Sequence, residues 1–334
     1  MKEKLSYENA GVSISGGDAW VETIKQLLAG HKKDENAIGG VGGFSGLYRI
    51  AGGQCLAACC DGVGTKLEVA RLVGQYRGLG QDLVAMNVND LVTCGASPLF
   101  FLDYAACGKL NAAVLKEIVA GVIDACEESL CVLLGGETAE MPGVYGNDGF
   151  DLAGFSVGIV DEDKIIDGSR IKDGDLAVGL ASSGVHSNGY SLVRRALIED
   201  GLKLDINCTP EGWNEPLADA LIRPTRLYVK AAAAARRTGK IHGMAHITGG
   251  GMYSNIMRVI PEGLRVDIDF TSWARPKIFG LIADAGVDEE EMRRVFNLGI
   301  GYVFILDNAD LPALQKTLEP LGEAPVIIGR VVKK

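Results

Sequence analysis

Short apolar segments alternate with polar, glycine-rich segments along most of the chain, and their spacing predicts the secondary structure. Between Asp18, a good N-cap residue, and Gly30, a good helix stop, apolar residues recur at helical spacing and predict a first helix. Further helices are expected over residues 81–94 and, capped by Asn111, over 111–129. Strands are expected over residues 47–50, 55–60, 99–106, 131–134 and 151–160.

The second half of the chain repeats the rough order of strand, glycine-rich loop and helix. Strands are expected over residues 175–181, 266–270, 301–306 and 324–332, and helices from about Tyr190, from Pro224 and from the glycines at 249–251 to about Pro261. The polar, glycine-rich segment 167–175 is the best candidate boundary between domains. The pattern predicts an α/β fold with α+β character, in two domains at residues 1–168 and 169–334.

Composition narrows the function classes. A length of 334 residues fits two domains, and a net charge of −10 argues against a nucleic-acid partner. The 8 cysteines lack C-x-x-C spacing, which favours buried, reduced thiols over a zinc site. No signal-peptide pattern and no apolar run of roughly 20 residues is visible, so we expect a cytoplasmic protein without a membrane partner.

Glycine-rich loops after apolar segments are the first candidate chemistry. They lie at residues 39–46, 61–66, 135–143, 182–189 and 247–251. Glycine lets backbone N–H groups approach an anion closely, and a helix N-terminus adds a favourable field for phosphate. Most single loops of this kind are only turns, but five of them favour phosphate binding. The P-loop, Rossmann and kinase motifs are absent, so ATP would bind by another architecture.

Acidic residues in these segments suggest a magnesium site. Asp61 ends an apolar strand, Glu137 lies in the loop 135–143, and Asp82 and Asp90 lie eight residues apart on one helical face. A few carboxylates with phosphate oxygens and water suit Mg²⁺. Each could instead be a turn-forming, capping or solvated residue. The asparagines in the otherwise apolar segment VAMNVNDLVTCGA would need buried partners, which a metal or a polar ligand would supply.

Two histidines and one lysine complete the candidate set. His186 lies in SGVHSNG and His246 precedes TGGG, so each is a candidate general acid/base or phosphate donor. Each could equally be a loop histidine bonded to a backbone carbonyl. Lys25, on the first helix, could be a solvated surface charge. No Ser-His-Asp or Cys-His spacing supports covalent acyl catalysis.

Taken together, the motifs GGVGGFSGLY, DGVGTKL, VNDLVTCGASPLFFLDY, GGETAEMPG, HSNGYSLVR, PTRLYVK, HITGGG and FNLGIG resemble those of phosphoribosylformylglycinamidine cyclo-ligases. The resemblance covers residues 6 to 301. It implies two α/β domains, with the N-terminal sheets of two subunits pairing into a barrel at a homodimer interface. It also implies an ATP- and Mg²⁺-dependent closure of formylglycinamidine ribonucleotide to aminoimidazole ribonucleotide, through phosphorylation of the formyl oxygen.

The resemblance also implies roles for individual residues. The implied catalytic residues are Lys25, Asp90 and His246. The implied nucleotide-binding residues are Gly42, Gly43, Asp61, Lys66, Asp82, Glu137 and Thr138, with Asp61, Asp90 and Glu137 on the metal. The implied substrate-binding residues are Gly135, Gly136, His186, Ser187, Asn188, Thr248, Gly249 and Gly250.

Two other readings remain open at this point. One is another ATP-using member of the same superfamily, such as a thiamine-phosphate kinase or a selenophosphate synthetase. The latter usually has a reactive Cys near its N-terminus, whereas the first Cys here is Cys55. The other is a non-catalytic nucleotide-binding regulator, which predicts the loss of carboxylates or loop histidines.

Overall fold

A computed structural model describes residues 5–32 and 34–334, which form two sheets with helices packed on them. The first sheet has the order β1 (Ala37–Ile38), β2 (Gly46–Ile50), β3 (Gln54–Gly62), β6 (Phe150–Asp161), β4 (Ser97–Cys107), β5 (Val132–Glu140). Neighbouring strands are antiparallel except β4 and β5, which are parallel.

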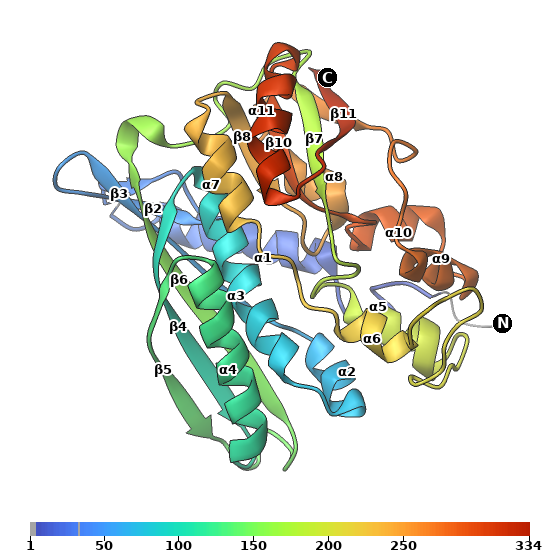
Figure 1. Cartoon of the computed structure of the whole chain (residues 1–334). Coiled ribbons are helices and arrows are strands. Elements are labelled where there is room, and N and C mark those ends of the chain that lie inside the picture. Colours follow the sequence, from blue (N-terminus) through green and yellow to red (C-terminus); the bar gives the residue numbers. More distant parts are fainter. Residues whose placement is uncertain (1–4, 33) are drawn as a thin grey trace.

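One face of this sheet is covered by α3 (Arg77–Leu91) and α4 (Ala112–Glu128), and α2 (Lys66–Val73) lies at the end of α3 (Figure 1). Residues of β3 and β6 alternate between buried and more exposed positions, as expected for a sheet with one covered face. α3 and α4 pack closely because Gly80 and Gly121 meet at their crossing, where a Cβ on either residue would collide with the other helix's backbone.

The second sheet has the order β8 (Ile241–His246), β10 (Ile300–Leu306), β7 (Leu176–Ala181), β11 (Val326–Lys333), β9 (Leu264–Ile268), with every pair antiparallel. Its helices are α5 (Tyr190–Arg194), α6 (Leu217–Ile222), α7 (Val229–Arg237), α8 (Gly251–Met257), α9 (Lys277–Asp284), α10 (Glu289–Val295) and α11 (Leu311–Leu318). The expected mixed α/β class is confirmed. The expected boundary at residues 168 and 169 lies between the two sheets; as a domain division it stays a prediction.

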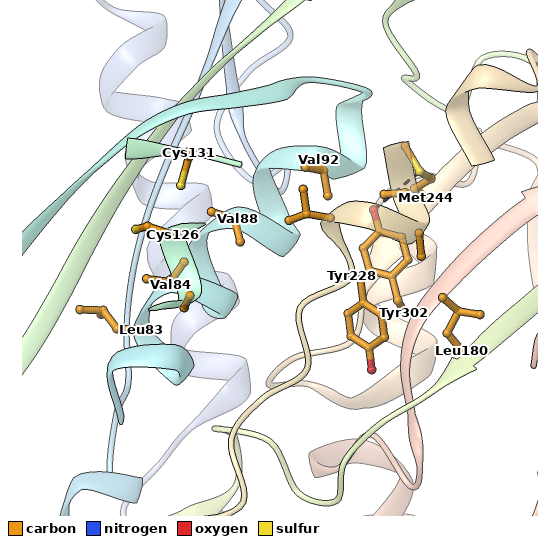
Figure 2. Packing of buried hydrophobic residues seen from close by; sticks show 14 of the residues in the cluster. Leu83, Val84, Val88, Val92, Cys126, Cys131, Leu180, Tyr228, Met244 and Tyr302 are labelled. Atoms are coloured by element: carbon orange, nitrogen blue, oxygen red, sulfur yellow. Dashed lines mark hydrogen bonds between the residues drawn. The ribbon is translucent and has the colours of Figure 1, made fainter. Parts of the chain in front are cut away.

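α3 belongs to the cores of both halves. A single buried cluster joins Val88 of α3 and Val92 just after α3 to Cys126 and Cys131 on one side and to Tyr228 and Tyr302 on the other (Figure 2). A helix packed from two sides keeps a fixed position relative to both sheets. Polar side chains on α3 are therefore held rigidly where the two halves meet.

The first helix, α1 (Ile14–Ala29), was predicted correctly, but its start was not. Ser13 is the N-cap, and its hydroxyl accepts a hydrogen bond from the Gly16 backbone N–H. Gly16 and Gly17 lie inside the helix, and such poor helix formers hide the first turn from a pattern search. None of the α1 side chains is buried, and Trp20 is 61% exposed.

Two further expectations were wrong. The segment GGETAE is not a loop: it continues β5, because its backbone pairs with β4 as far as Glu140. Pro224 does not open a helix, and α7 begins only at Val229. The intervening backbone N–H groups of Thr225 and Tyr228 instead donate to side chains of α3. Among the described residues, no helix combines the length and apolarity needed to cross a bilayer.

Candidate functional site

Three predicted residues meet where the C-terminal end of α3 touches the second sheet. Asp90 on α3 and His246 at the end of β8 form a close pair, with 2.7 Å between Asp90 Oδ1 and His246 Nδ1. Asp61, near the end of β3, lies close enough for the Asp90 charge to raise its pKa. The structure thus brings together Asp61, Asp90 and His246 from three separate motifs.

Both ring nitrogens of His246 are engaged, and its side chain is fully buried. The Asn89 Nδ2 group lies 3.4 Å from His246 Nε2, and the same group donates to the Arg226 carbonyl. Asn89 Oδ1 accepts from the Tyr228 backbone N–H, which fixes the orientation of the amide. His246 Nε2 is therefore the acceptor, and Nδ1 carries the proton that is donated to Asp90.

Burial is the main cause that raises the pKa of Asp61 to about 6, and the nearby Asp90 charge adds to it. The Gly62 backbone N–H, His246 and Arg258 act in the opposite direction. Two carboxylates that repel each other in a desolvated place are stabilised by a cation between them. Asp61 and Asp90 thus fit Mg²⁺, which binds one or two protein carboxylates with phosphate oxygens and water.

The glycine-rich loop 39–46 is linked to this carboxylate pair through Arg258. Its Phe44 is buried against the second half of the chain and packs under the Arg258 guanidinium, 5.0 Å from the ring centre. Residues 39–45 line an open groove of about 1440 Å³ between the two halves of the chain. Arg258 lines the same groove, and its charge also lowers the pKa of Asp61. Arg258 was not singled out from the sequence, because the helix α8 separates it from the glycine-rich loop 247–251.

Lys25 reaches the same loop from α1. Its side chain is 48% exposed and forms an ion pair with Glu22 at 3.3 Å. A Cβ placed on Gly42 would lie 3.8 Å from Lys25 Cε, so the lysine stem lies directly beside this glycine. Gly42 has φ +112, a backbone conformation that favours glycine. Gly42 and Gly43 thus line the groove, and Lys25 lies beside Gly42.

The loop 247–251 is organised by a residue that the sequence did not single out. Asn255 of α8 is fully buried, and its amide donates to the carbonyl oxygens of Thr248, Gly249 and Gly251. Thr248 also donates its hydroxyl to Asn255. These contacts turn the loop carbonyls inward, toward the helix. The signal in the sequence was an asparagine one helical turn after the glycines.

Lys66 and Asp82 lie apart from this group, at the other end of α3. Both side chains are buried, and Lys66 Nζ lies 2.7 Å from Asp82 Oδ2 and 2.9 Å from Oδ1. Lys66 also donates to the Arg223 carbonyl. Burial lowers the pKa of Lys66, while the charge of Asp82 opposes that shift. Both charged groups are thus engaged by the protein, and their nucleotide-binding roles stay predictions.

The loop 182–189 is held from both sides. His186 is buried with φ +64, and its Nε2 accepts from the Ser183 backbone N–H at 3.1 Å. Ser187 donates to Asp82 at 3.0 Å. Asn297, in the motif FNLGIG, bonds the loop from the opposite side through the carbonyls of Gly184 and Val185. Only Asn188 of the three predicted substrate residues keeps partial exposure.

The residues predicted on β5 do not join either group within one chain. β5 is the edge strand, three strands from β3, or about 14 Å at ordinary strand spacing. Glu137 is paired with Tyr104 and so aligns with Gly62, one residue out of phase with Asp61. Glu137 thus points to the opposite face of the sheet from Asp61. The side chains of Glu137 and Thr138 are exposed, and Gly136 lies over Asp103.

The asparagines of α3 do not require a ligand, contrary to expectation. Asn87 exchanges hydrogen bonds with the backbone of Asp61 and also donates to the Leu83 carbonyl. Asn89 is satisfied by the backbone of Arg226 and Tyr228. Among the described residues, no group of three or more His, Cys, Asp or Glu side chains forms a ready-made metal site. A metal would therefore need phosphate oxygens to complete its ligands.

Both halves of the chain match a known protein family. Residues 42–160 match the N-terminal domain, and residues 172–334 the C-terminal domain, of the AIR synthase related protein family. The chain is 48% identical to a phosphoribosylformylglycinamidine cyclo-ligase of Myxococcus xanthus over 98% of this chain and 95% of that protein. It is 46% identical to the Bacillus pumilus cyclo-ligase, over 98% and 96%.

A solved thiamine-monophosphate kinase from Stenotrophomonas maltophilia shares the fold, with a TM-score of 0.65, 18% identity and 93% coverage of both chains. This likeness extends to the fold alone. The near-complete match to the cyclo-ligases is far stronger. The chain belongs to the phosphoribosylformylglycinamidine cyclo-ligase family.

Proposed function

We propose that the protein closes the imidazole ring of aminoimidazole ribonucleotide from formylglycinamidine ribonucleotide, with ATP hydrolysed to ADP and phosphate, in purine biosynthesis. An amide oxygen is a poor leaving group, so ATP first phosphorylates the formyl oxygen. The amidine nitrogen then attacks the formyl carbon, and phosphate leaves with that oxygen. Family membership favours this reaction over the kinase and selenophosphate synthetase alternatives.

The observation that carries the proposal is the meeting of Asp61, Asp90 and His246 at the start of the loop 247–251, with Arg258 interacting with both Asp61 and Phe44 of the loop 39–46. Phosphoryl transfer needs alignment of two reactants and neutralisation of the transferring charge. Mg²⁺ on Asp61 and Asp90 would supply that charge when bound. Lys25 and Arg258 add cationic groups around the backbone N–H groups of Gly42 and Gly43. His246 holds the Asp90 carboxylate through Nδ1–H, and this bond orients a metal ligand.

A homodimer and a cytoplasmic location are further parts of this proposal. The face of the first sheet opposite α3 and α4 exposes large apolar residues, among them Phe155 at 46% and Val132 at 61%. An uncovered apolar sheet face is a typical protein interface. Pairing two such faces would form the barrel. Phe155→Asp should convert the dimer to a monomer in light scattering, and a dimer that persists would contradict this interface.

The activity has a direct test. Purified protein is incubated with formylglycinamidine ribonucleotide, ATP and Mg²⁺, and the aminoimidazole product is measured. We expect product and ADP in equal amounts, and no product when ATP or Mg²⁺ is omitted. Parallel reactions with thiamine phosphate or selenide test the two alternatives. Turnover of either in place of the formylglycinamidine substrate would overturn the proposal.

A further inference from the structure

The Asp82 carboxylate is the centre of a buried hydrogen-bond network that links the two halves of the chain. Its Oδ1 receives Lys66 Nζ at 2.9 Å, the Ser187 hydroxyl at 3.0 Å and the Thr225 backbone N–H at 2.7 Å. The Thr225 hydroxyl also donates to Oδ1, at 2.8 Å. Lys66, Asp82, Ser187 and Thr225 are all buried. We call these four residues the Asp82 clamp.

The Asp82 clamp leaves Ser187 without a proton for a substrate. The Ser187 and Thr225 hydroxyls lie 2.8 Å apart, and both lie within 3.0 Å of Asp82 Oδ1. Each hydroxyl has a single proton, so both protons are committed inside this triangle. His186 is also buried, and its Nε2 is occupied by the Ser183 N–H. Ser187 therefore supports the loop, whereas the buried Nδ1 atom of His186 has no hydrogen-bond partner among the described residues.

Asn188 differs from its neighbours. From Gly184 to Tyr190, every residue except Asn188 is buried. Its amide nitrogen makes only a weak contact, 3.7 Å from Met86 Sδ, and its Oδ1 lies beside Gly249 of the opposite loop. A side chain amide with both donor and acceptor capacity is thus held at the meeting point of the loops 182–189 and 247–251.

We propose that Asp82 is a positioning residue, which acts through Ser187 and Thr225 to fix the loop 182–189 so that the Asn188 amide meets the substrate. The inference rests on the proposed ring closure and assigns the substrate side of that site. Lys66 compensates the buried charge of Asp82 and ties the network to α2. A loop fixed before the substrate arrives loses less conformational entropy on binding.

Thr225→Val is the sharpest probe, because it keeps the shape and the backbone N–H of residue 225 and removes only the hydroxyl. We expect the KM for formylglycinamidine ribonucleotide to rise about tenfold while the KM for ATP changes by less than about twofold. Amide hydrogen exchange of residues 183–189 should quicken by about tenfold. Asn188→Ala should raise the same KM without changing the exchange.

Gln81→Met is the matched control. Gln81 also reaches Thr225 from α3, through a 2.8 Å bond to its carbonyl, but does not contact Ser187. It should leave both KM values and the exchange unchanged. Wild-type exchange and KM in Thr225→Val, or equal effects of Gln81→Met, would overturn the positioning role. Because exchange is read without substrate, it decides this inference even if wild-type protein fails the ring-closure assay.

Discussion

The two carboxylates of α3 that face the second half of the chain have opposite surroundings. Asp82 is fully buried and receives four hydrogen bonds at one oxygen, and the Lys66 ammonium group lies 2.7 Å from the other oxygen. Asp90 has a close partner in His246, retains partial exposure and lies near the like charge of Asp61. Position on a helix face does not separate a structural carboxylate from a ligand-binding one. The set of partners does.

The largest effect is expected for Asp90, at the C-terminal end of α3. Asp90→Asn keeps an oxygen that accepts from His246 but removes the charge, so kcat should fall by about 10³-fold, or about 4 kcal/mol of transition-state stabilisation. The melting temperature should stay close to that of the wild type. Steady-state kinetics measure kcat, and calorimetry measures the melting temperature. The control for charge removal is Asp124→Asn on α4, where Asp124 forms an exposed ion pair with Arg77 of α3. Near-normal turnover of Asp90→Asn would remove Asp90 from the metal site.

Substitution of Asp82, in the N-terminal half of α3, should lower the free energy of unfolding. Asp82→Asn leaves the buried Lys66 without its counter-charge, which costs about 3–5 kcal/mol of the free energy of unfolding. Urea denaturation measures this loss. A variant with Lys66→Met added should recover part of it, because the uncompensated charge is gone. Equal stability of wild type and Asp82→Asn would show that this network is not what holds the two halves together.

The surroundings of Asp90 and Asp82 also show which parts of the site could be predicted from the sequence. The motifs singled out Asp61, Asp90 and His246, which the structure brings together from β3, α3 and β8. They also suggested Lys66 and Asp82 for phosphate, because a motif does not reveal that a Lys and an Asp 16 residues apart are buried against each other. Thr225 went unrecognised, because its partners Asp82 and Ser187 are far from it in the sequence. Asn255 contacts carbonyls of the glycine-rich loop just before it, and this local signal was overlooked.

Lys25 offers an intermediate effect. Lys25→Ala should raise the KM for ATP about tenfold, because it removes one cation from the side of the groove lined by Gly42 and Gly43. The dimer fraction in light scattering should not change. Lys32→Ala, on the exposed end of the same segment, is the control. An unchanged KM and rate for Lys25→Ala would return Lys25 to a solvated surface role.

The smallest effect is a pH dependence of stability. Burial holds the pKa of His186 well below its ordinary value of 6.5. Below about pH 6.5 this histidine binds a proton in the unfolded state but stays neutral in the folded state. The free energy of unfolding is therefore highest above about pH 6.5 and falls as the pH drops below that value, by about 1.4 kcal/mol per pH unit for one proton. His186→Asn, which tolerates the positive φ, should lack this share of the slope in urea titrations from pH 7.5 to 5. An identical slope in both proteins would contradict a neutral, buried His186.

The difference between the two carboxylates is tested most directly by Mn²⁺ in place of Mg²⁺. Electron paramagnetic resonance with ATP would follow metal bound to wild type, Asp90→Asn and Thr225→Val. We expect wild type and Thr225→Val to hold the Mn²⁺–ATP complex alike, and Asp90→Asn to bind it at least about tenfold more weakly. Equal binding of Mn²⁺–ATP by Asp90→Asn and wild type would contradict a metal site at the C-terminal end of α3.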